Sequence, residues 1–354
     1  MLKVKSPFHN AFKLQGKSFQ TVNELIDFSK GISEEVADFL TDWFDATPFV
    51  EVKTSGSTGN PKTIPLQKIH MINSAKATGD YFNLPENTAA LLCMSPNYIA
   101  GKMMFVRALT LGWHLDVVAP TSNPLKNSDK NYDFSAMVPM QLHNSLSYIH
   151  KIKKLIVGGG TVSNELLSKI QEVKTEIFAT YGMTETITHI AVKRINVIAG
   201  RVKQTQYKIL PNIQISLDYR GCLVIDAPTI SEEKVVTNDL VELISSTEFK
   251  WLGRIDNVIN SGGIKLIPEQ IEEKLAEIIE NRFFVAGKKD EILGEKLILI
   301  VEGINNGDLL NKIQQLKFLS TYEIPKEIYF LEKLTETQTN KIDRVKTLGF
   351  LDKG

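Results

Sequence analysis

Short apolar runs alternate with helical stretches through the first half of the chain, and this alternation constrains the fold more than any other feature. The runs lie at residues 89–94, 115–119, 136–138, 155–157 and 177–179. Alternating strands and helices are typical of an α/β sheet with helices packed on it. We therefore expect an α/β fold for the large N-terminal part of the chain.

The pattern changes between about residue 208 and residue 245. Short strands are interrupted there by Pro and Gly, at residues 208–209, 213–217, 222–225 and 241–244. Frequent interruption of this kind predicts an antiparallel β module after the α/β sheet.

Both ends of the chain add smaller units. Residues 1–48 predict an irregular lead-in with one helix, which Ser33 would cap, and residues 67–82 predict another helix. Pro268 occupies the position typical of a helix start, and strands at 283–286, 297–301 and 327–331 with a helix at 309–319 follow it. This part predicts a small α+β domain of about 100 residues. We place the domains at residues 1–255 and 256–354.

The composition is typical of a soluble globular protein whose positive and negative charges balance. The 354 residues suggest two domains, 43% are apolar, and 41 Lys and Arg residues balance 41 Asp and Glu residues. This balance gives no reason to expect a nucleic-acid partner or an anionic membrane. The two cysteines are far apart, which fits a reducing compartment. We see no leader sequence and no membrane-spanning stretch, and we expect a cytoplasmic protein without stable membrane insertion.

Residues 54–63 read T-S-G-S-T-G-N-P-K-T and predict a phosphate-binding loop. The spacing of glycine and lysine is that of a P-loop, but Pro61 replaces the glycine before the lysine. Proline has no N–H to offer a phosphate, so a P-loop NTPase is disfavoured. Hydroxyls, glycines and one lysine still suit an anion, although a flexible loop is the alternative. The candidate ligands are Thr54, Ser55, Gly56, Ser57, Thr58, Gly59 and Lys62.

Two further clusters follow strand-like runs. The aromatic ring, hydroxyl and carboxylate of Tyr181, Thr184 and Glu185 would suit a nucleotide base, a phosphate oxygen and Mg²⁺. The alternative is an ordinary loop in which Thr184 caps a helix. Three glycines from Gly158 to Gly160 permit close approach of a ligand, but they equally permit a tight turn.

Charged residues later in the chain give weaker signals. The Asp239 carboxylate would accept hydrogen bonds from both hydroxyls of a ribose, and the planar guanidinium of Arg254 would donate hydrogen bonds to the same sugar. The alternative is a solvated turn with a surface ion pair. Lys341 lies in a polar stretch near the C-terminus, where composition alone indicates only exposure to solvent.

Taken in order, these segments resemble the adenylate-forming superfamily of acyl-CoA synthetases, adenylation domains and luciferases. Residues 54–62 are similar to its S-G-S-T-G-x-P-K loop, residues 181–185 to Y-G-x-T-E, and residues 237–239 to T-G-D. Residues 253–272 are similar to G-R-x-D-x-x-x-x-x-G-G-x-x-x-x-P-x-x-I-E, and residues 340–344 to G-K-[IV]-D-R. Five ordered motifs over residues 50–345 make the resemblance specific.

The resemblance implies a role for each matching residue. The loop at 54–62 would hold the β- and γ-phosphates of ATP, and Thr184 would touch the α-phosphate. Glu185 would bind Mg²⁺, and Lys341 would bridge the attacking carboxylate and the α-phosphate. Gly158, Gly159, Tyr181 and Gly182 would frame adenine, Asp239 and Arg254 would hold the ribose, Asp256 would be the hinge to a mobile C-terminal domain, and Gly262 and Gly263 would approach coenzyme A.

The chain departs from the superfamily pattern in several places. Its front end is shorter, and Tyr98 replaces the histidine of the acyl-gate segment that also contains Gly101. Asn238 and Asn340 replace glycines of the motifs, and we expect them to be tolerated because asparagine adopts the left-handed conformation nearly as glycine does.

The short front end and the glycine run are most similar to o-succinylbenzoate–CoA ligases of menaquinone synthesis. Lys102 and Arg107, beyond the gate segment, would suit a second substrate carboxylate. We expect both to face solvent instead, because Lys and Arg side chains are mostly exposed.

The implied activity is that of an acid–CoA ligase that uses ATP, Mg²⁺ and coenzyme A. It would form an acyl-adenylate and then a thioester. Another acyl- or aryl-CoA ligase and an enzyme that loads a separate carrier protein remain alternatives within the superfamily. A nucleotide-binding scaffold that has lost catalysis is the alternative from another class. The sequence leaves the identity of the acid and the oligomeric state open.

Overall fold

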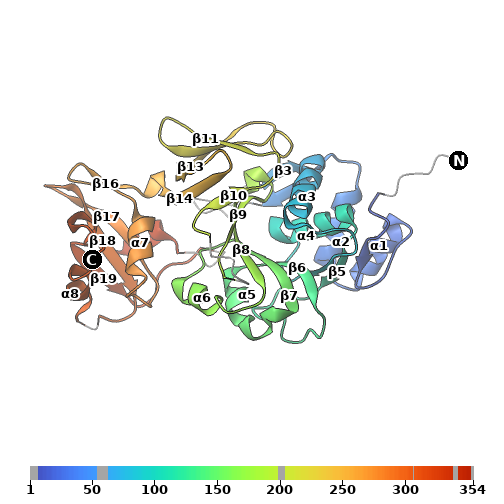
Figure 1. Ribbon diagram of the computed structural model, residues 1–354, viewed down its shortest axis with the longest axis horizontal. Helices are drawn as coiled ribbons and strands as arrows, with labels where there is room; N and C mark the ends of the chain where they lie inside the picture. The colour runs from blue at the N-terminus through green and yellow to red at the C-terminus, as the bar shows by residue number, and fades with distance from the viewer. Residues whose placement is uncertain (1–6, 54–62, 198–203, 306, 338–341, 352–354) are drawn as a thin grey trace.

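The structure is a computed structural model that describes residues 7–53, 63–197, 204–305, 307–337 and 342–351. A twelve-stranded sheet runs through the larger part of the molecule, and a five-stranded sheet lies at the other end of its long axis (Figure 1). The predicted α/β fold is confirmed.

The first half of the large sheet is parallel, in the order β1-β5-β4-β6-β7-β8. These strands are Lys13–Leu14 (β1), His114–Val117 (β5), Ala89–Leu92 (β4), Tyr132–Met137 (β6), Ile152–Val157 (β7) and Glu176–Gly182 (β8). From β8 onward the neighbours are antiparallel, in the order β9-β10-β14-β13-β12-β11. Their bounds are His189–Arg194 (β9), Tyr207–Ile209 (β10), Glu248–Arg254 (β14), Val235–Leu243 (β13), Cys222–Asp226 (β12) and Gln214–Leu217 (β11). The expected antiparallel module therefore continues the α/β sheet.

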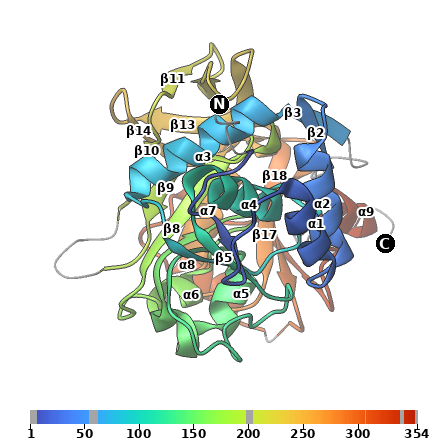
Figure 2. The same cartoon turned by 90° about the vertical axis from the view of Figure 1, so that its right-hand side faces the viewer.

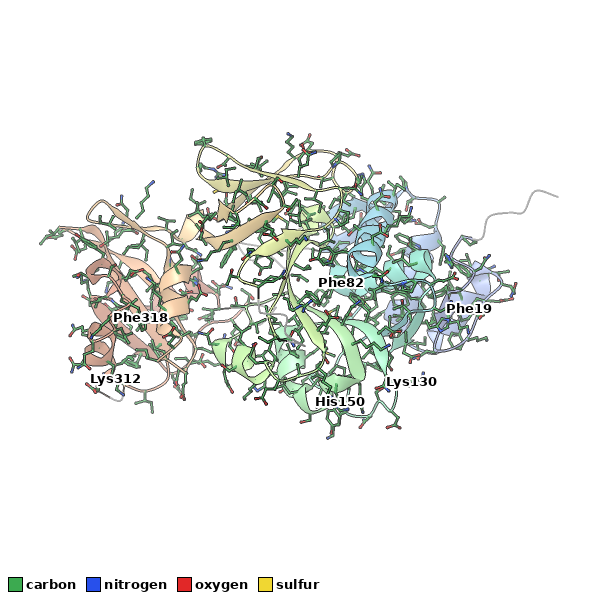
Figure 3. The ribbon with its side chains drawn as sticks, in the orientation of Figure 1. Phe19, Phe82, Lys130, His150, Lys312 and Phe318 are labelled. Carbon is green, nitrogen blue, oxygen red and sulfur yellow. The ribbon has the colours of Figure 1, made fainter. Side chains whose placement is uncertain are left out.

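Helices cover both faces of the parallel half because side chains alternate along buried strands. Ile156 and Phe178 pack with helices α3 (Lys68–Phe82) and α4 (Ile99–Leu111), which Figure 2 shows in front of the sheet. Leu155 and Ile177 face the other side, where α5 (Pro139–Asn144), the 3₁₀ helix η1 (Leu146–Lys151) and α6 (Asn164–Lys169) lie. Phe82, labelled in Figure 3, joins α3 to the sheet by packing edge-on against Phe178, with ring centroids 5.0 Å apart.

Two helices follow β1, α1 (Val22–Lys30) and α2 (Glu34–Phe44), where the sequence predicts one. Ser33 caps α2 as expected, since its hydroxyl accepts a hydrogen bond from the Val36 amide at 3.2 Å. The missed helix begins after Thr21, whose hydroxyl accepts from the Glu24 amide at 3.2 Å. Thr-x-x-Glu is the sequence of a capping box, so the signal for α1 was present in the chain.

The five-stranded sheet has the order β16-β15-β18-β17, and β19 pairs with β18. Its strands are Ile259–Ser261 (β15), Ile264–Leu266 (β16), Phe283–Asp290 (β17), Gly294–Glu302 (β18) and Glu327–Leu331 (β19). The helical elements here are α7 (Pro268–Leu275), α8 (Leu309–Gln314), the 3₁₀ helix η4 (Thr321–Glu323) and α9 (Arg344–Leu351). Pro268 opens α7 as expected, whereas α8 ends five residues earlier than the helix expected over 309–319.

The buried clusters of this C-terminal part contain no described residue before Ile259, and the cluster of the large sheet ends at Phe249. Separate cores support the division at residues 255 and 256 that we propose. Across the described ranges, none of the helices has the length and apolar character needed to cross a bilayer.

Candidate active site

The carboxyl ends of three parallel strands meet at one edge of the large sheet. Met137 on β6 is level with Val157 on β7, and Val157 is level with Ala179 on β8. The glycine run follows β7, and Tyr181 lies at the end of β8. Open α/β sheets bind their ligands at such an edge. The sequence-predicted residues Gly158 and Tyr181 are thus brought together.

Glycine is required at the first two positions of the run for different structural reasons. A Cβ atom on Gly158 would lie 2.5 Å from the hydroxyl oxygen of Thr180, so a larger residue does not fit beside β8. Gly159 has φ +79°, a left-handed conformation that most residues avoid. The run therefore makes both a close strand contact and a tight turn.

Asp239 on β13 lies at the centre of a hydrogen-bonded group. One carboxylate oxygen accepts from the Tyr181 hydroxyl at 2.7 Å, and the other accepts from the Trp251 indole at 3.1 Å. The Arg254 Nε atom lies 3.8 Å from the second oxygen. Burial, followed by the charge of Asp239, raises the pKa of Tyr181, so its hydroxyl stays a donor. Three residues predicted from the sequence meet here, and Trp251 is an addition that sequence analysis missed.

Thr184 and Glu185 lie in a short 3₁₀ helix, η2 (Thr184–Thr186), after β8. The Glu185 side chain is exposed. No group of three or more His, Cys, Asp or Glu side chains that would hold a metal occurs within the described ranges. Any Mg²⁺ here would therefore need oxygen ligands from a bound phosphate beside the Glu185 carboxylate, as Mg²⁺ sites often have.

The loop after η2 is held in a strained conformation. Ile187 has φ +65° and ψ −59°, and the Thr188 amide donates to the Thr186 carbonyl at 2.7 Å across it. This γ-turn is rare, and a β-branched residue at positive φ is an outlier. The buried Thr186 hydroxyl accepts from the Met183 amide at 3.1 Å and braces the loop. Strain of this kind is often found at functional sites.

Asp256 lies in the 3₁₀ helix η3 (Ile255–Asn257), between β14 of the large sheet and β15 of the small one. Hydrogen bonds from Arg254, at 2.8 Å, and from the Asn238 amide, at 3.1 and 3.2 Å, lower the pKa of its carboxyl against the effect of burial. Gly262 and Gly263 form the turn between β15 and β16, with φ +60° and +83°.

Asn238 corrects one expectation. It is not among the described residues with positive φ and lies in strand β13. Its tolerance in place of glycine therefore does not depend on the left-handed conformation. The side chain instead bridges two charged residues, since it accepts from Arg220 at 3.0 Å and donates to Asp256.

Helix α4 carries the residues of the gate segment. Tyr98 precedes the first turn and is 58% exposed. A Cβ atom on Gly101 would lie 2.2 Å from the Ser95 carbonyl oxygen, so the preceding loop packs directly on the helix.

Lys102 and Arg107 are buried, with exposed fractions of 7% and 1%, so the expectation that both face solvent is wrong. The Lys102 ammonium lies 4.9 Å from the ring centre of Phe39 on α2, and burial lowers its pKa. The helix is enclosed by α2, α3 and the sheet, and this tertiary packing overrides the usual exposure of cations.

Arg107 has no carboxylate partner among the described residues. Its Nε atom is 3.4 Å from the Thr78 hydroxyl, one terminal nitrogen is 3.7 Å from Met104 Sδ, and the other has no partner. Burial lowers the pKa of Arg107 to about 9. His189, at the start of β9, also has an unpartnered buried Nε2 atom, and burial and the nearby Arg107 charge lower its pKa.

The loop at 54–62, with Thr54, Ser55, Gly56, Ser57, Thr58, Gly59 and Lys62, and also Asn340 and Lys341 lie outside the described residues. The strands on either side of this loop are β2 (Phe49–Lys53) and β3 (Thr63–Gln67), which pair antiparallel with Lys53 opposite Thr63.

Residues 48–224, half of the chain, match the family described as AMP-binding enzyme. The chain belongs to this family. It is 39% identical to an acyl-CoA synthetase (AMP-forming)/AMP-acid ligase II-like protein from Dyadobacter fermentans, whose crystal structure matches 90% of this chain and 95% of that one with a TM-score of 0.60. This AMP-binding enzyme is accordingly an ATP-dependent, AMP-forming acid–CoA ligase.

More distant relatives have a common description. A 2-succinylbenzoate–CoA ligase from Staphylococcus epidermidis is 25% identical over 325 residues, which are 83% of this chain and 68% of the relative. A probable 2-succinylbenzoate–CoA ligase from Mycobacterium tuberculosis is 25% identical, with 83% and 82% covered. The structure of an o-succinylbenzoate coenzyme A synthetase from Bacillus subtilis, in complex with ATP and magnesium ion, has a TM-score of 0.73 at 20% identity and covers 84% of this chain and 69% of that one.

Two hollows in the described part of this AMP-binding enzyme lie away from the predicted site residues. A hollow of ≈ 690 Å³ borders the carboxyl end of α3, the amino end of β8 and strand β10. A second hollow of ≈ 160 Å³ lies between α3, His189 and the chain around Leu210. The hydrogen-bonded group around Asp239 borders neither. The group around Asp239 and the ends of β7 and β8 form the candidate nucleotide site, whereas His189, whose Nε2 atom has no partner, lines the smaller hollow.

Proposed function

We propose that this AMP-forming ligase activates o-succinylbenzoate and transfers it to coenzyme A. The acid has two carboxylates. One would react with ATP to give the acyl-adenylate and pyrophosphate, and coenzyme A would then displace AMP to give the thioester. The distant relatives described as 2-succinylbenzoate–CoA ligases support this choice of acid.

The observation that carries the proposal is the unpaired Arg107. A buried cation without a counter-charge is costly, and buried charges are normally paired. Arg107 and His189 offer unsatisfied nitrogen atoms in the interior between α4 and β9. A second substrate carboxylate would satisfy the guanidinium by a charge-assisted hydrogen bond. An acid with one carboxylate would leave it unpaired.

The nucleotide would lie at the strand ends beside β8. We assign adenine to Tyr181 and the glycines after β7, and the ribose hydroxyls to Asp239, which Trp251 and Tyr181 already orient. The loop at 54–62 would hold the outer phosphates. Mg²⁺, when bound at Glu185, would neutralise phosphate charge.

Lys341 would neutralise charge that develops between the attacking carboxylate and the α-phosphate. Such stabilisation acts in the transition state of adenylation. Asp256 would be the point about which the C-terminal domain turns between the two half-reactions. The domain would then bring the turn at Gly262 and Gly263 against coenzyme A.

The role of Lys341 can be tested by measuring the two half-reactions separately. Lys341→Ala should nearly abolish adenylation, because the charge of the transition state is no longer neutralised. Thioester formation from preformed acyl-adenylate should be spared. Separate single-turnover assays measure both steps, and equal loss in both would refute the assignment.

A panel of carboxylic acids tests the substrate. The wild-type enzyme should release AMP with o-succinylbenzoate and coenzyme A, and the analogue that lacks one carboxylate should be a poor substrate. Thioester formation with coenzyme A alone separates this function from loading of a carrier protein. Absence of AMP with o-succinylbenzoate, together with turnover of a monocarboxylic acid, would contradict the proposal.

A further inference from the structure

Asn238 links strand β13 of the large sheet to η3, the segment that leads into the small sheet. Its carbonyl oxygen accepts a hydrogen bond from Arg220 at 3.0 Å, and its amide nitrogen donates to both oxygens of Asp256 at 3.1 and 3.2 Å. An amide has one acceptor end and one donor end. Because the guanidinium can only donate, it orients the amide so that the donor end faces Asp256.

Arg220 is itself held firmly at the turn between β11 and β12. Asp218 accepts from the Arg220 Nε atom at 2.7 Å and from the backbone amides of Arg220 and Cys222. One terminal nitrogen of Arg220 donates to the Thr237 carbonyl at 2.9 Å, and the other reaches Asn238. All three nitrogens of the guanidinium are used, so Arg220 is a fixed support for the amide.

Few side-chain hydrogen bonds run from the large sheet to η3, and helix α7 also packs on β14, where the side chains of Ile267 and Glu269 lie close to Gly253. Asp256 accepts from Arg254 and from Asn238. No described hydrophobic cluster includes residues from both sides of η3. A few exposed hydrogen bonds are individually weak, so they hold one orientation without preventing another.

We propose that Arg220 and Asn238 are positioning residues that hold Asp256 and thereby bias the orientation of the C-terminal domain. The bridge depends on the side-chain amide of Asn238, which a glycine at this position would not supply. The inference rests on the proposed function, because it assumes that the two half-reactions use different orientations. Loss of the bridge then changes the rate of one half-reaction relative to the other.

Two single variants and their combination test the bridge. Asn238→Ala removes the amide, and Arg220→Ala removes its support. Lys234→Ala is the matched control, because it removes another cation and its ion pair with Asp226 from the same part of the sheet without contact to Asn238. For each protein, single-turnover assays measure adenylation and, separately, thioester formation from preformed acyl-adenylate.

A second measurement needs no substrate. Spin labels on Ile69→Cys and Ile304→Cys, which replace exposed side chains on the two sides of η3, report the distance between the large and small sheets. The native Cys93 and Cys222 are buried and should not be labelled. Because the distances do not depend on the acid, failure of o-succinylbenzoate as substrate is distinguished from failure of this inference.

We expect Asn238→Ala and Arg220→Ala to change the ratio of the two half-reaction rates in the same direction, by about fivefold, as for a population shift controlled by one hydrogen bond. The distance distribution should shift in both variants and stay unchanged in Lys234→Ala. Since Arg220 acts through Asn238, adding Arg220→Ala to Asn238→Ala should change the ratio no further. A wild-type ratio and distance distribution in Asn238→Ala, or a full effect of Arg220→Ala in its background, would overturn the inference.

Discussion

Replacement of Arg107 by methionine should stabilise the protein while it destroys selectivity for a dicarboxylic acid. The guanidinium is 1% exposed and has no carboxylate partner among the described residues. Methionine has a similar length and no charge, so it fills the same space between α3 and α4. Stability and activity therefore respond to this substitution in opposite directions.

The size of the stability effect follows from the pKa of Arg107. Burial lowers it from 12.5 to about 9. The charged form is thus disfavoured by folding, and at about 1.4 kcal/mol for each pKa unit the cost is at most on the order of 5 kcal/mol. Below pH 9 the group is charged in both the folded and the unfolded protein, so the full cost is present at neutral pH and fades only as the pH rises from about 9 towards 12.5.

Relaxation around the charge reduces this figure. Replacement of buried ions by apolar side chains stabilises proteins by about 1–4 kcal/mol, and we expect Arg107→Met to raise the free energy of unfolding within this range. Urea denaturation at neutral pH measures it, with Arg107→Lys as a control that keeps the charge and should bring no such gain.

Activity should fall for one class of acid only. Loss of one partner of a buried charge pair costs about 2–5 kcal/mol, or roughly 30- to 5,000-fold in kcat/KM. We expect this loss with o-succinylbenzoate and a much smaller one with its monocarboxylic analogue, in an assay of pyrophosphate release. A destabilised variant with equal losses on both acids would refute the reasoning, because Arg107 would then be a structural residue only.

Three further substitutions test local features. Trp251→Phe removes one hydrogen bond to Asp239 and should raise the KM for ATP by about tenfold, while an unchanged KM would show that the indole does not orient the carboxylate. Thr186→Val keeps the shape but leaves the Met183 amide without its partner, so single-turnover adenylation should slow by about tenfold; wild-type rates would show that the strained loop needs no brace. Ser33→Ala should lower the free energy of unfolding by about 1 kcal/mol through loss of the α2 cap, and altered kinetics instead would contradict a purely structural role.

Local sequence patterns predicted most of the fold. Short apolar runs that alternate with helical stretches predicted the α/β sheet, and the cap at Ser33 and the proline at 268 predicted where two helices begin. These features depend on neighbours in the sequence, which is why they are visible before the chain folds. The helix after Thr21 was missed although its capping box was present, so that omission is one of interpretation.

The features that the sequence did not predict depend on contacts between residues far apart in the chain. Lys102 and Arg107 are buried because α2, α3 and the sheet enclose α4. The general rule that cations face solvent therefore gave a wrong prediction for these two residues. Trp251 was not singled out because its role depends on the pairing of β13 with β14, which sets its indole beside Asp239. Asn238 was compared with glycine through its backbone, whereas the structure uses its side chain.

The nucleotide products of a single incubation test the central claim most directly. The protein would be mixed with ATP, Mg²⁺ and o-succinylbenzoate, and phosphorus resonances would be followed before and after coenzyme A is added. Pyrophosphate and an enzyme-bound acyl-adenylate should form first, and free AMP should appear with the thioester after the addition. Release of ADP and orthophosphate, or no consumption of ATP with any acid, would contradict an adenylate-forming ligase at the ends of β7 and β8.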